Sequence, residues 1–348
     1  MQHRTEAEQR GAGQQRDGER TDERPHYILG MTEDERAVID QGWLESDRSG
    51  KRAPATPSHA SESMRDRVCV VTGANRGLGK ATAMGLARAG ARVLLLCRSR
   101  EDGERAAAEI ARSTGHAALE VVQVDLASHA SIRDAAARIT ARHDALHVLV
   151  NNAGVNVARR TLTPDGRETT LAVNHLAPFL LTSLLLPALA RGARPDRSAR
   201  VVTVTSMFER FGRMRFDDLD RRRRYVGLLA YTQSKLANIL FTRALARRVA
   251  EHGITATCAD PGLVGTDLMR DRIWYRVSLL RALWRPWLSE PAAGARAALL
   301  AASSPALEGV TGECIDRRGR IVRTSRRSRD AAAAERLWQA SERLTEAR

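Results

Sequence analysis

The apolar residues of the chain form short β-like runs separated by stretches with helical spacing. The runs predict strands at residues 68–72, 92–97, 119–124, 146–151, 200–206, 255–259 and 313–316. Between them, apolar residues recur every three to four positions, which predicts helices at residues 78–89, 101–113, 131–142, 165–190 and 231–251. Repeated alternation of strand and helix forces parallel strands with crossover helices. The pattern predicts an α/β fold built on a single doubly wound parallel sheet with helices on both faces.

The first 63 residues lack this pattern. They hold 13 acidic and 9 basic residues, with Gln, Gly, Ser and Pro between them. Such a composition cannot bury enough apolar surface to offset the entropy lost on ordering. We therefore expect a disordered N-terminal extension at residues 1–63, followed by one domain at residues 64–348. Met64 lies at the boundary, so the sequence leaves open whether residues 1–63 belong to the natural protein.

The charge balance is strongly basic, but it does not indicate a nucleic-acid site. The 348 residues carry 56 Lys and Arg against 41 Asp and Glu, and all the cations except Lys51, Lys80 and Lys235 are arginines. The arginines are scattered, which indicates a sequence-wide preference for Arg with only weak, non-specific attraction to polyanions. A lysine that persists in such a chain calls for a chemical reason.

The cysteines and the apolar runs bound the class of protein further. Four cysteines without paired C-x-x-C spacing give no disulfide framework and no metal site. No apolar stretch reaches the ~18 residues that cross a bilayer, and no signal peptide is visible. We expect a soluble, cytoplasmic protein. The sequence does not decide whether it is a monomer or a homo-oligomer.

Three glycines follow the first predicted strand, where it becomes a helix. They are Gly73, Gly77 and Gly79 of the segment Thr-Gly-Ala-Asn-Arg-Gly-Leu-Gly. Glycine lets the backbone turn sharply and approach a diphosphate, whose charge is met by the helix N-terminus. The setting predicts a Rossmann-type dinucleotide site. The other loop residues assigned to it are Asn75, Arg76 and Leu78.

The end of the second predicted strand bears on the choice between NAD and NADP. An acidic residue there would bond the ribose 2′-hydroxyl of NAD. This chain has Cys97 followed by Arg98, with no carboxylate before Glu101. A guanidinium matches the 2′-phosphate of NADP in charge and geometry, and Arg76 could add a second contact. We therefore expect NADP(H); the alternative for Arg98 is a solvated arginine at a strand end.

Tyr231 and Lys235 are four residues apart on a predicted helix and so share one face. A nearby ammonium favours the ionised form of a phenol and makes it a usable acid or base near neutral pH. The lysine could also bond the nicotinamide ribose. An isolated pair of this kind usually decorates a surface. Together with the glycine loop and with Ser206 at the end of a predicted strand, it predicts an active site.

These motifs resemble the short-chain dehydrogenase/reductase family over about residues 65–345. Residues 72–79 match its TGxxxGxG loop, residues 151–154 its NNAG motif and residues 231–235 its YxxxK motif. The resemblance implies that Ser206 polarises the substrate oxygen, Tyr231 exchanges the proton, Lys235 orients the ribose and Asn174 holds a water of the proton relay. It also implies cofactor contacts from Asp125, Leu126, Asn151, Ala153, Gly154, Pro261, Gly262 and Thr266.

Finer features resemble the NADP-dependent retinol-dehydrogenase-like branch, which includes the oxidoreductase domain of the WW-domain oxidoreductase. The similar segments are residues 95–98, 173–176, 216–219, 234–238 and 336–342. Ala177-Pro178 departs from Gly-His of that branch, and Asp260 departs from its His before Pro-Gly. We expect Pro178 to kink the long helix near Asn174. The departures put the branch's substrate in doubt more than its chemistry.

Residues 266–290 are the candidate substrate end. They hold three of the five tryptophans, with aliphatic residues and arginines between them. The segment fits a lid over an apolar substrate, an interfacial helix touching anionic lipid, or a packed helix pair. The run Arg221 to Arg224 favours a solvated face over an anion site.

Together these features predict an NADP(H)-dependent oxidoreductase that acts on an apolar aldehyde, ketone or alcohol. One alternative is a nucleotide-sensing regulatory protein on the same fold, without turnover. Another is an enzyme of the sugar-nucleotide epimerase or dehydratase type, whose glycine spacing resembles GxxGxxG instead. A pure sensor would not require Asn174, Ser206, Tyr231 and Lys235 together.

Overall fold

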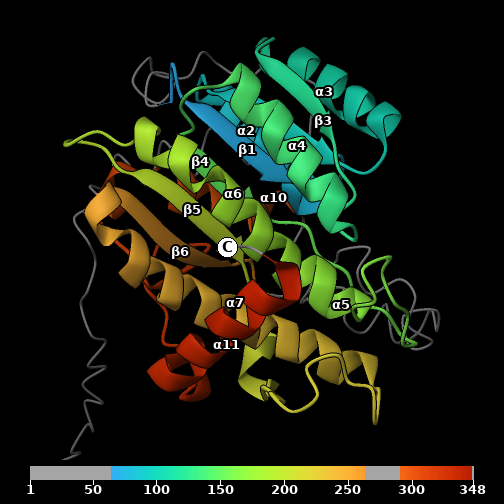
Figure 1. The fold of residues 1–348 in the computed structure, drawn as a ribbon. Helices are drawn as coiled ribbons and strands as arrows, with labels where there is room; N and C mark the ends of the chain where they lie inside the picture. The colour runs from blue at the N-terminus through green and yellow to red at the C-terminus, as the bar shows by residue number, and fades with distance from the viewer. Residues whose placement is uncertain (1–63, 263–290, 347–348) are drawn as a thin grey trace, which may run out of the picture.

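The computed structural model describes residues 64–262 and 291–346, which form a doubly wound sheet with helices on both faces (Figure 1). Its strands run in the order β3-β2-β1-β4-β5-β6-β7, and all neighbouring pairs are parallel. Their bounds are β1 Val68–Thr72, β2 Arg92–Cys97, β3 Leu119–Gln123, β4 Val148–Asn151, β5 Ala199–Val204, β6 Ile254–Asp260 and β7 Cys314–Asp316. The predicted fold class is confirmed. The strand order reverses between β1 and β4, and ligands of such sheets bind outside the carboxyl ends of the strands at that point.

Consecutive strand residues are buried against opposite faces, which explains the continuous apolar runs. Val70, Leu94 and Leu96 join the core under α4 (His129–Arg142), α6 (Ala177–Gly192) and α7 (Gly227–Val249). Val71, Val93 and Leu95 join the core under α2 (Gly77–Arg88), α3 (Arg100–Thr114) and α10 (Pro291–Ser303). Each face of the sheet therefore has its own apolar layer.

The long helix expected at residues 165–190 is divided in the structure. Gly166 has φ +72 in a turn, and the side chain of Glu168 accepts the N–H groups of Thr170 and Leu171, so the helix begins only at α5 (Thr169–Leu171). A π turn, η1 (Ala172–Leu176), then leads into α6. Pro178 has no N–H to donate four residues back, and the N–H of Ala177 bonds Ala172 O, five residues back. A π turn therefore lies at the place near Asn174 where a kink is expected.

The segment Thr169–Gly192 is also long and apolar enough to cross a membrane, with a mean hydropathy of 1.5 in its most apolar window. However, 78% of that window is buried inside the domain. The α6 helix packs beside α4 and against β4 and β5, with Leu180 and Leu185 fully buried. The apolar composition of the helix is therefore accounted for by core packing.

Within residues 64–262 and 291–346, two helices were not among the predicted elements, and α7 begins earlier than predicted. The unforeseen helices are α10 and α11 (Ala331–Thr345). The α7 helix begins at Gly227, four residues before the predicted start at residue 231. The α11 helix lies across α7 and brings the Trp338 ring to 4.9 Å from the Phe179 ring and 6.0 Å from the Phe241 ring. It closes the outer side of α6 and α7 (Figure 1).

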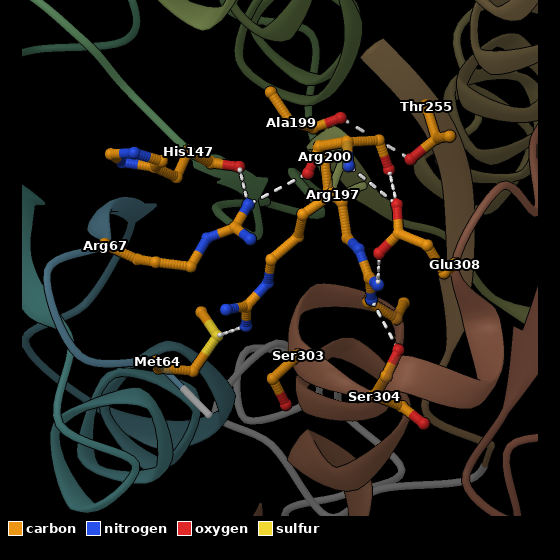
Figure 2. Close-up of polar contacts among 12 residues, drawn as sticks. Met64, Arg67, His147, Arg197, Ala199, Arg200, Thr255, Ser303, Ser304 and Glu308 are labelled. Atoms are coloured by element: carbon orange, nitrogen blue, oxygen red, sulfur yellow. Dashed lines mark hydrogen bonds and ion pairs between the residues drawn. The ribbon is translucent and has the colours of Figure 1, made fainter. Parts of the chain in front are cut away.

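Buried arginines connect the amino-terminal ends of the strands (Figure 2). Arg67, just before β1, donates to the Ser198 carbonyl at 2.9 Å. Arg200, in β5, donates to the Ser304 carbonyl at 2.8 Å and to Glu308 at 2.6 Å. Glu308 also accepts the Ser198 N–H at 2.7 Å. The cluster thus ties β1, β5 and the chain after α10 together at one edge of the sheet.

Candidate active site

The glycine loop forms an open cradle where β1 passes into α2. A Cβ on Gly79 would lie 2.2 Å from the Gly73 carbonyl oxygen, so no larger residue fits there. Gly77 has φ +54, and a Cβ on it would meet nothing within 4 Å. The first turn of α2 therefore presents backbone N–H groups beside open space. This arrangement fits the diphosphate of a dinucleotide.

Thr72 fastens this loop to the segment after β4, a contact that the sequence analysis missed. Its hydroxyl accepts the N–H groups of Asn152 at 2.9 Å and of Ala153 at 3.0 Å. The side chain of Asn152 donates back to the Thr72 carbonyl at 2.8 Å. The signal was available, because polar residues end two strands that adjoin in a doubly wound sheet. The neighbouring Asn151 donates instead to Thr182 of α6 at 3.0 Å.

The adenosine end of the predicted cofactor site lies along the carboxyl ends of β2 and β3. Arg98 follows β2 and is exposed, and its carbonyl accepts a hydrogen bond from Gln123 at 3.1 Å. Asp125 follows β3, and its carboxylate accepts the Ala127 N–H at 2.9 Å. Since β1, β2 and β3 are adjacent, Arg98 and Asp125 share one sheet edge with Arg76 of the glycine loop. The other predicted residues of this edge, Asn75, Leu78 and Leu126, are all half-buried.

Ser206, Tyr231 and Lys235 are assembled from β5 and α7. Ser206 lies just beyond β5, and its hydroxyl accepts the Phe208 N–H at 3.4 Å at the start of the 3₁₀ helix η2 (Met207–Phe211). The Phe208 ring meets the Tyr231 ring edge-on, with centroids 6.3 Å apart. The Lys235 ammonium lies 5.7 Å from the centroid of the Tyr231 ring. The predicted shared helix face is therefore present.

Lys235 is deeply buried, with only 4% of its surface exposed. Its ammonium donates to the Val204 carbonyl at 3.0 Å, and Thr205 donates to the Lys235 carbonyl at 3.1 Å. Burial lowers the pKa of Lys235 to about 8, against the opposing charge of Asp260. The ammonium also faces the segment after β4, since a Cβ on Gly154 would lie 3.7 Å from it.

Asn174 sits in the π turn and connects this cluster to the segment after β4. Its amide oxygen accepts the Val155 N–H at 2.7 Å. Its amide nitrogen donates to the Val155 carbonyl and to the Ser234 hydroxyl, both at 2.9 Å. Asn174 is completely buried, so these bonds hold residues 154–155 against α7. The role of the asparagine in a water relay stays a prediction.

Asp260 is the last residue of β6, and its carboxylate bonds both the segment after β6 and the segment after β5. Its carboxylate accepts the Gly262 N–H at 3.0 Å and the N–H of Met207, the residue after Ser206. Burial raises the pKa of the Asp260 carboxyl, against these two bonds. Pro261 and Gly262 follow at the carboxyl edge of the sheet, whereas Thr266 and the candidate lid 266–290 lie outside the described residues.

The run 221–224 is only partly the solvated face that its sequence favours. Arg222, Arg223 and Arg224 are exposed. Arg221 is 4% exposed, so the expectation was wrong for this residue. It adopts a left-handed conformation with φ +48, and burial lowers its pKa against the opposing charges of Glu168 and Asp218.

The fold and the site define a nucleotide-binding protein of the dehydrogenase type, and the comparisons make this specific. The family model for short chain dehydrogenases matches residues 67–274. Mouse (Mus musculus) retinol dehydrogenase 12 is 42% identical over 275 residues, which cover 79% of this chain and 85% of that protein.

Two solved structures support the same assignment. A protein from Mycobacterium paratuberculosis is 38% identical with a TM-score of 0.66, covering 81% of this chain and 94% of its own. The Pseudomonas aeruginosa RhlG/NADP active-site complex is 25% identical with a TM-score of 0.61, covering 74% and 97%. The chain belongs to the short-chain dehydrogenase/reductase family, in its retinol-dehydrogenase-like branch.

Proposed function

We propose that this protein is an NADP(H)-dependent oxidoreductase that interconverts an apolar aldehyde or ketone and its alcohol. The proposal rests on the buried Lys235 ammonium beside the Tyr231 ring, with Ser206 on the adjoining strand end. When bound, the nicotinamide supplies or takes up the hydride. The protein's part is to orient the carbonyl and to move one proton.

The proton step belongs to Tyr231. In reduction, the Tyr231 hydroxyl gives its proton to the substrate oxygen, and the Lys235 ammonium stabilises the negative charge left on the phenol oxygen. The Ser206 hydroxyl donates to the same substrate oxygen and fixes its position. Lys235 would also bond the ribose of the bound cofactor. Asn174 keeps residues 154–155 in place through its bonds to Val155.

NADP is favoured over NAD by the charge at the end of β2. Arg98 is exposed there, and no carboxylate precedes Glu101. A guanidinium suits the 2′-phosphate. The relative from Pseudomonas aeruginosa is described as an NADP complex.

An apolar substrate is favoured by the side chains around Tyr231. Met207 and Phe211 of η2 are 39% and 67% exposed. Val226 and Leu228, at the start of α7, are 39% and 38% exposed. The two segments that carry Ser206 and Tyr231 therefore present apolar surface to an incoming ligand. The mouse relative carries the name retinol dehydrogenase, which also denotes an apolar alcohol.

Replacing Tyr231 with Phe tests the proposed chemistry. The purified protein with NADPH should reduce apolar aldehydes and ketones in preference to sugars. Tyr231→Phe should lower kcat by roughly 100-fold or more, the scale of lost acid–base catalysis, while NADPH binding persists. The control is Tyr225→Phe, which removes a hydroxyl that bonds the Val157 carbonyl away from Lys235 and should change kcat only a few-fold. Near-normal turnover of Tyr231→Phe would contradict the assignment, and NADPH binding without any carbonyl turnover would favour the nucleotide-sensing alternative.

Replacing Arg98 with Asp tests the choice of cofactor. The unaltered protein should bind NADPH more tightly than NADH by about 1–3 kcal/mol, the range for a charge-assisted contact. Arg98→Asp should reverse this order in fluorescence titrations. The matched control is Arg100→Asp. Arg100 is also an exposed arginine, but it is the first residue of α3 and pairs with Glu104. Equal affinities in the unaltered protein would remove the basis of the NADP assignment.

A further inference from the structure

A cavity of about 370 Å³ adjoins Ser206 on its β7 side. Ser206 and Met207 line it together with Asp260, Arg323 and Thr324. Ile239, Cys314 and Val322 supply apolar surface. The volume is within the range of small-molecule pockets. A substrate held by its oxygen at Ser206 could extend into this space.

The charged side chains that line the cavity indicate which kind of ligand group it favours. Glu209 and Asp260 are acidic, while Arg210 and Arg323 are basic. Both oxygens of Glu209 are already engaged, by the N–H and the hydroxyl of Ser325 at 2.8 and 2.6 Å. The two acidic and two basic residues balance in formal charge, so the lining as a whole favours neither an anionic nor a cationic group. A neutral hydroxyl suits the lining, because it both donates and accepts hydrogen bonds.

Asp260 is the acceptor that such a hydroxyl would find. Its carboxylate has about four acceptor positions, and two take the backbone N–H groups of Gly262 and Met207. These two bonds fix the carboxylate at the cavity wall directly after Ser206. The carboxylate shares the cavity lining with the apolar side chains of Ile239 and Val322. Asp260 is also one of the two sequence departures from the retinol-dehydrogenase-like branch.

We propose that this cavity is a substrate subsite in which Asp260 accepts a hydrogen bond from a hydroxyl group several carbons from the reacting carbonyl. The preferred substrates are then hydroxyalkyl aldehydes, ketones or the corresponding diols, with an apolar chain against Ile239 and Val322. The inference rests on the proposed function, since it places the reacting oxygen at Ser206. It deepens that proposal by naming a second group on the substrate.

A pair of substrates of equal length tests the subsite. With NADPH, kcat/KM for 6-hydroxyhexanal should exceed that for hexanal by roughly tenfold, as expected for a hydrogen bond to a charged acceptor. Asp260→Asn should bring this ratio close to one. The ratio cancels any general effect of the substitution on Ser206 or Lys235, because both substrates share them.

Asp316→Asn is the matched control. Asp316 is the register partner of Asp260 on β7, and its carboxylate bonds Arg320 outside the cavity lining. The substitution removes the same charge from the neighbouring strand and should leave the ratio unchanged. An equal loss in both variants would overturn the proposal in favour of a general electrostatic effect.

Two further measurements separate the subsite from the proposed function. Val322→Phe should fill the cavity. It should lower kcat/KM for 6-hydroxyhexanal at least fivefold more than kcat/KM for propanal; an equal effect on both would overturn the proposal.

Calorimetry with the NADPH-saturated protein should show tighter binding of 1,6-hexanediol than of 1-hexanol. This difference in affinity should be lost in Asp260→Asn. Selective diol binding without turnover would retain the subsite and reject the reductase function. Turnover of both aldehydes with equal kcat/KM would retain the function and reject the subsite.

Discussion

Lys235 is one of three lysines in a chain that otherwise uses arginine, and its surroundings account for the difference. The side chain is buried, bonded to the Val204 carbonyl and close to the Tyr231 ring. A guanidinium there would be bulkier and would remain protonated at any accessible pH. An ammonium is compact, and burial brings its pKa to about 8.

This pKa predicts how cofactor binding depends on pH. Lys235 is charged below pH 8 and neutral above it, so the affinity for NADPH should fall as the pH rises through about 8. Fluorescence titration between pH 6.5 and 9.5 measures the effect, on the order of 1 kcal/mol for one lost charge-assisted bond. Lys235→Arg keeps its charge and should bind NADPH with little pH dependence in this range, although its turnover should be impaired. The same decline in the arginine variant would assign the titration to another group.

Spacing along the sequence is sufficient to predict the candidate site residues whose own side chains would carry the proposed chemistry. Tyr231 and Lys235 were found by helical spacing, and Gly79 by its place in a strand–helix turn. Thr72 and the hydrogen bonds of Asp260 were not found. Their function lies in backbone groups of distant segments, and only the strand order brings those segments within hydrogen-bonding distance.

At the scale of elements, α11 is one of two helices of the core that the sequence analysis did not predict. Trp338 stacks on Phe241 and meets Phe179 edge-on, while the Arg248 guanidinium lies 4.1 Å from the indole centroid. Asp330 caps the helix by accepting the Ala333 N–H at 3.0 Å. The strands were predictable because each buries successive residues on two faces. Alanine-rich α10 shows this contrast weakly in the sequence. In α11 the buried Ala334, Leu337 and Ser341 do recur at helical spacing, a signal that the sequence analysis did not use.

Trp338→Ala should therefore destabilise the whole domain. Loss of a half-buried indole that contacts two aromatic rings should lower the free energy of unfolding by about 2–4 kcal/mol. Urea denaturation followed by circular dichroism measures this quantity. The neighbouring Gln339 is exposed, and Gln339→Ala should change stability by less than about 0.5 kcal/mol. A similar small change for Trp338→Ala would show that α11 does not contribute to the core.

At the scale of the whole molecule, the carboxyl and amino ends of the strands differ: the candidate site lies at the carboxyl edge, and a network of buried arginines lies at the amino edge. The carboxyl edge carries the glycine cradle, Ser206 and Asp260. The amino edge carries Arg67, Arg200 and Glu308, which join distant segments through hydrogen bonds (Figure 2). Burial would raise the pKa of Glu308, but the bonds from Ser198 and Arg200 outweigh it and lower the pKa to about 2.

Glu308 should therefore make stability depend on pH in the acid range. Because its folded-state pKa lies below the usual 4.5, the stabilisation is present above about pH 4.5 and is lost as the pH falls towards 2. Allowing for solvent screening of a side chain that is one-third exposed, the loss should be about 1–2 kcal/mol. Urea unfolding at pH 2.5 and 5 should show this difference in the unaltered protein and a smaller one in Glu308→Gln. Since Glu308 lies at the edge away from the site, kcat/KM of the variant at neutral pH should be unchanged, and a large drop would mean that the two edges are coupled.

The position of α11 also affects how the protein is made. During synthesis, α6 and α7 leave the ribosome well before residues 331–345. The rings of Phe179 and Phe241 therefore lack their contact with Trp338 until α11 has been synthesised. Translation at about 5–20 residues per second makes this interval several seconds long. A chaperone that shields apolar helices would have its main opportunity in that interval. A premature stop codon before residue 331 would make the exposure permanent and direct the product towards aggregation or proteolysis.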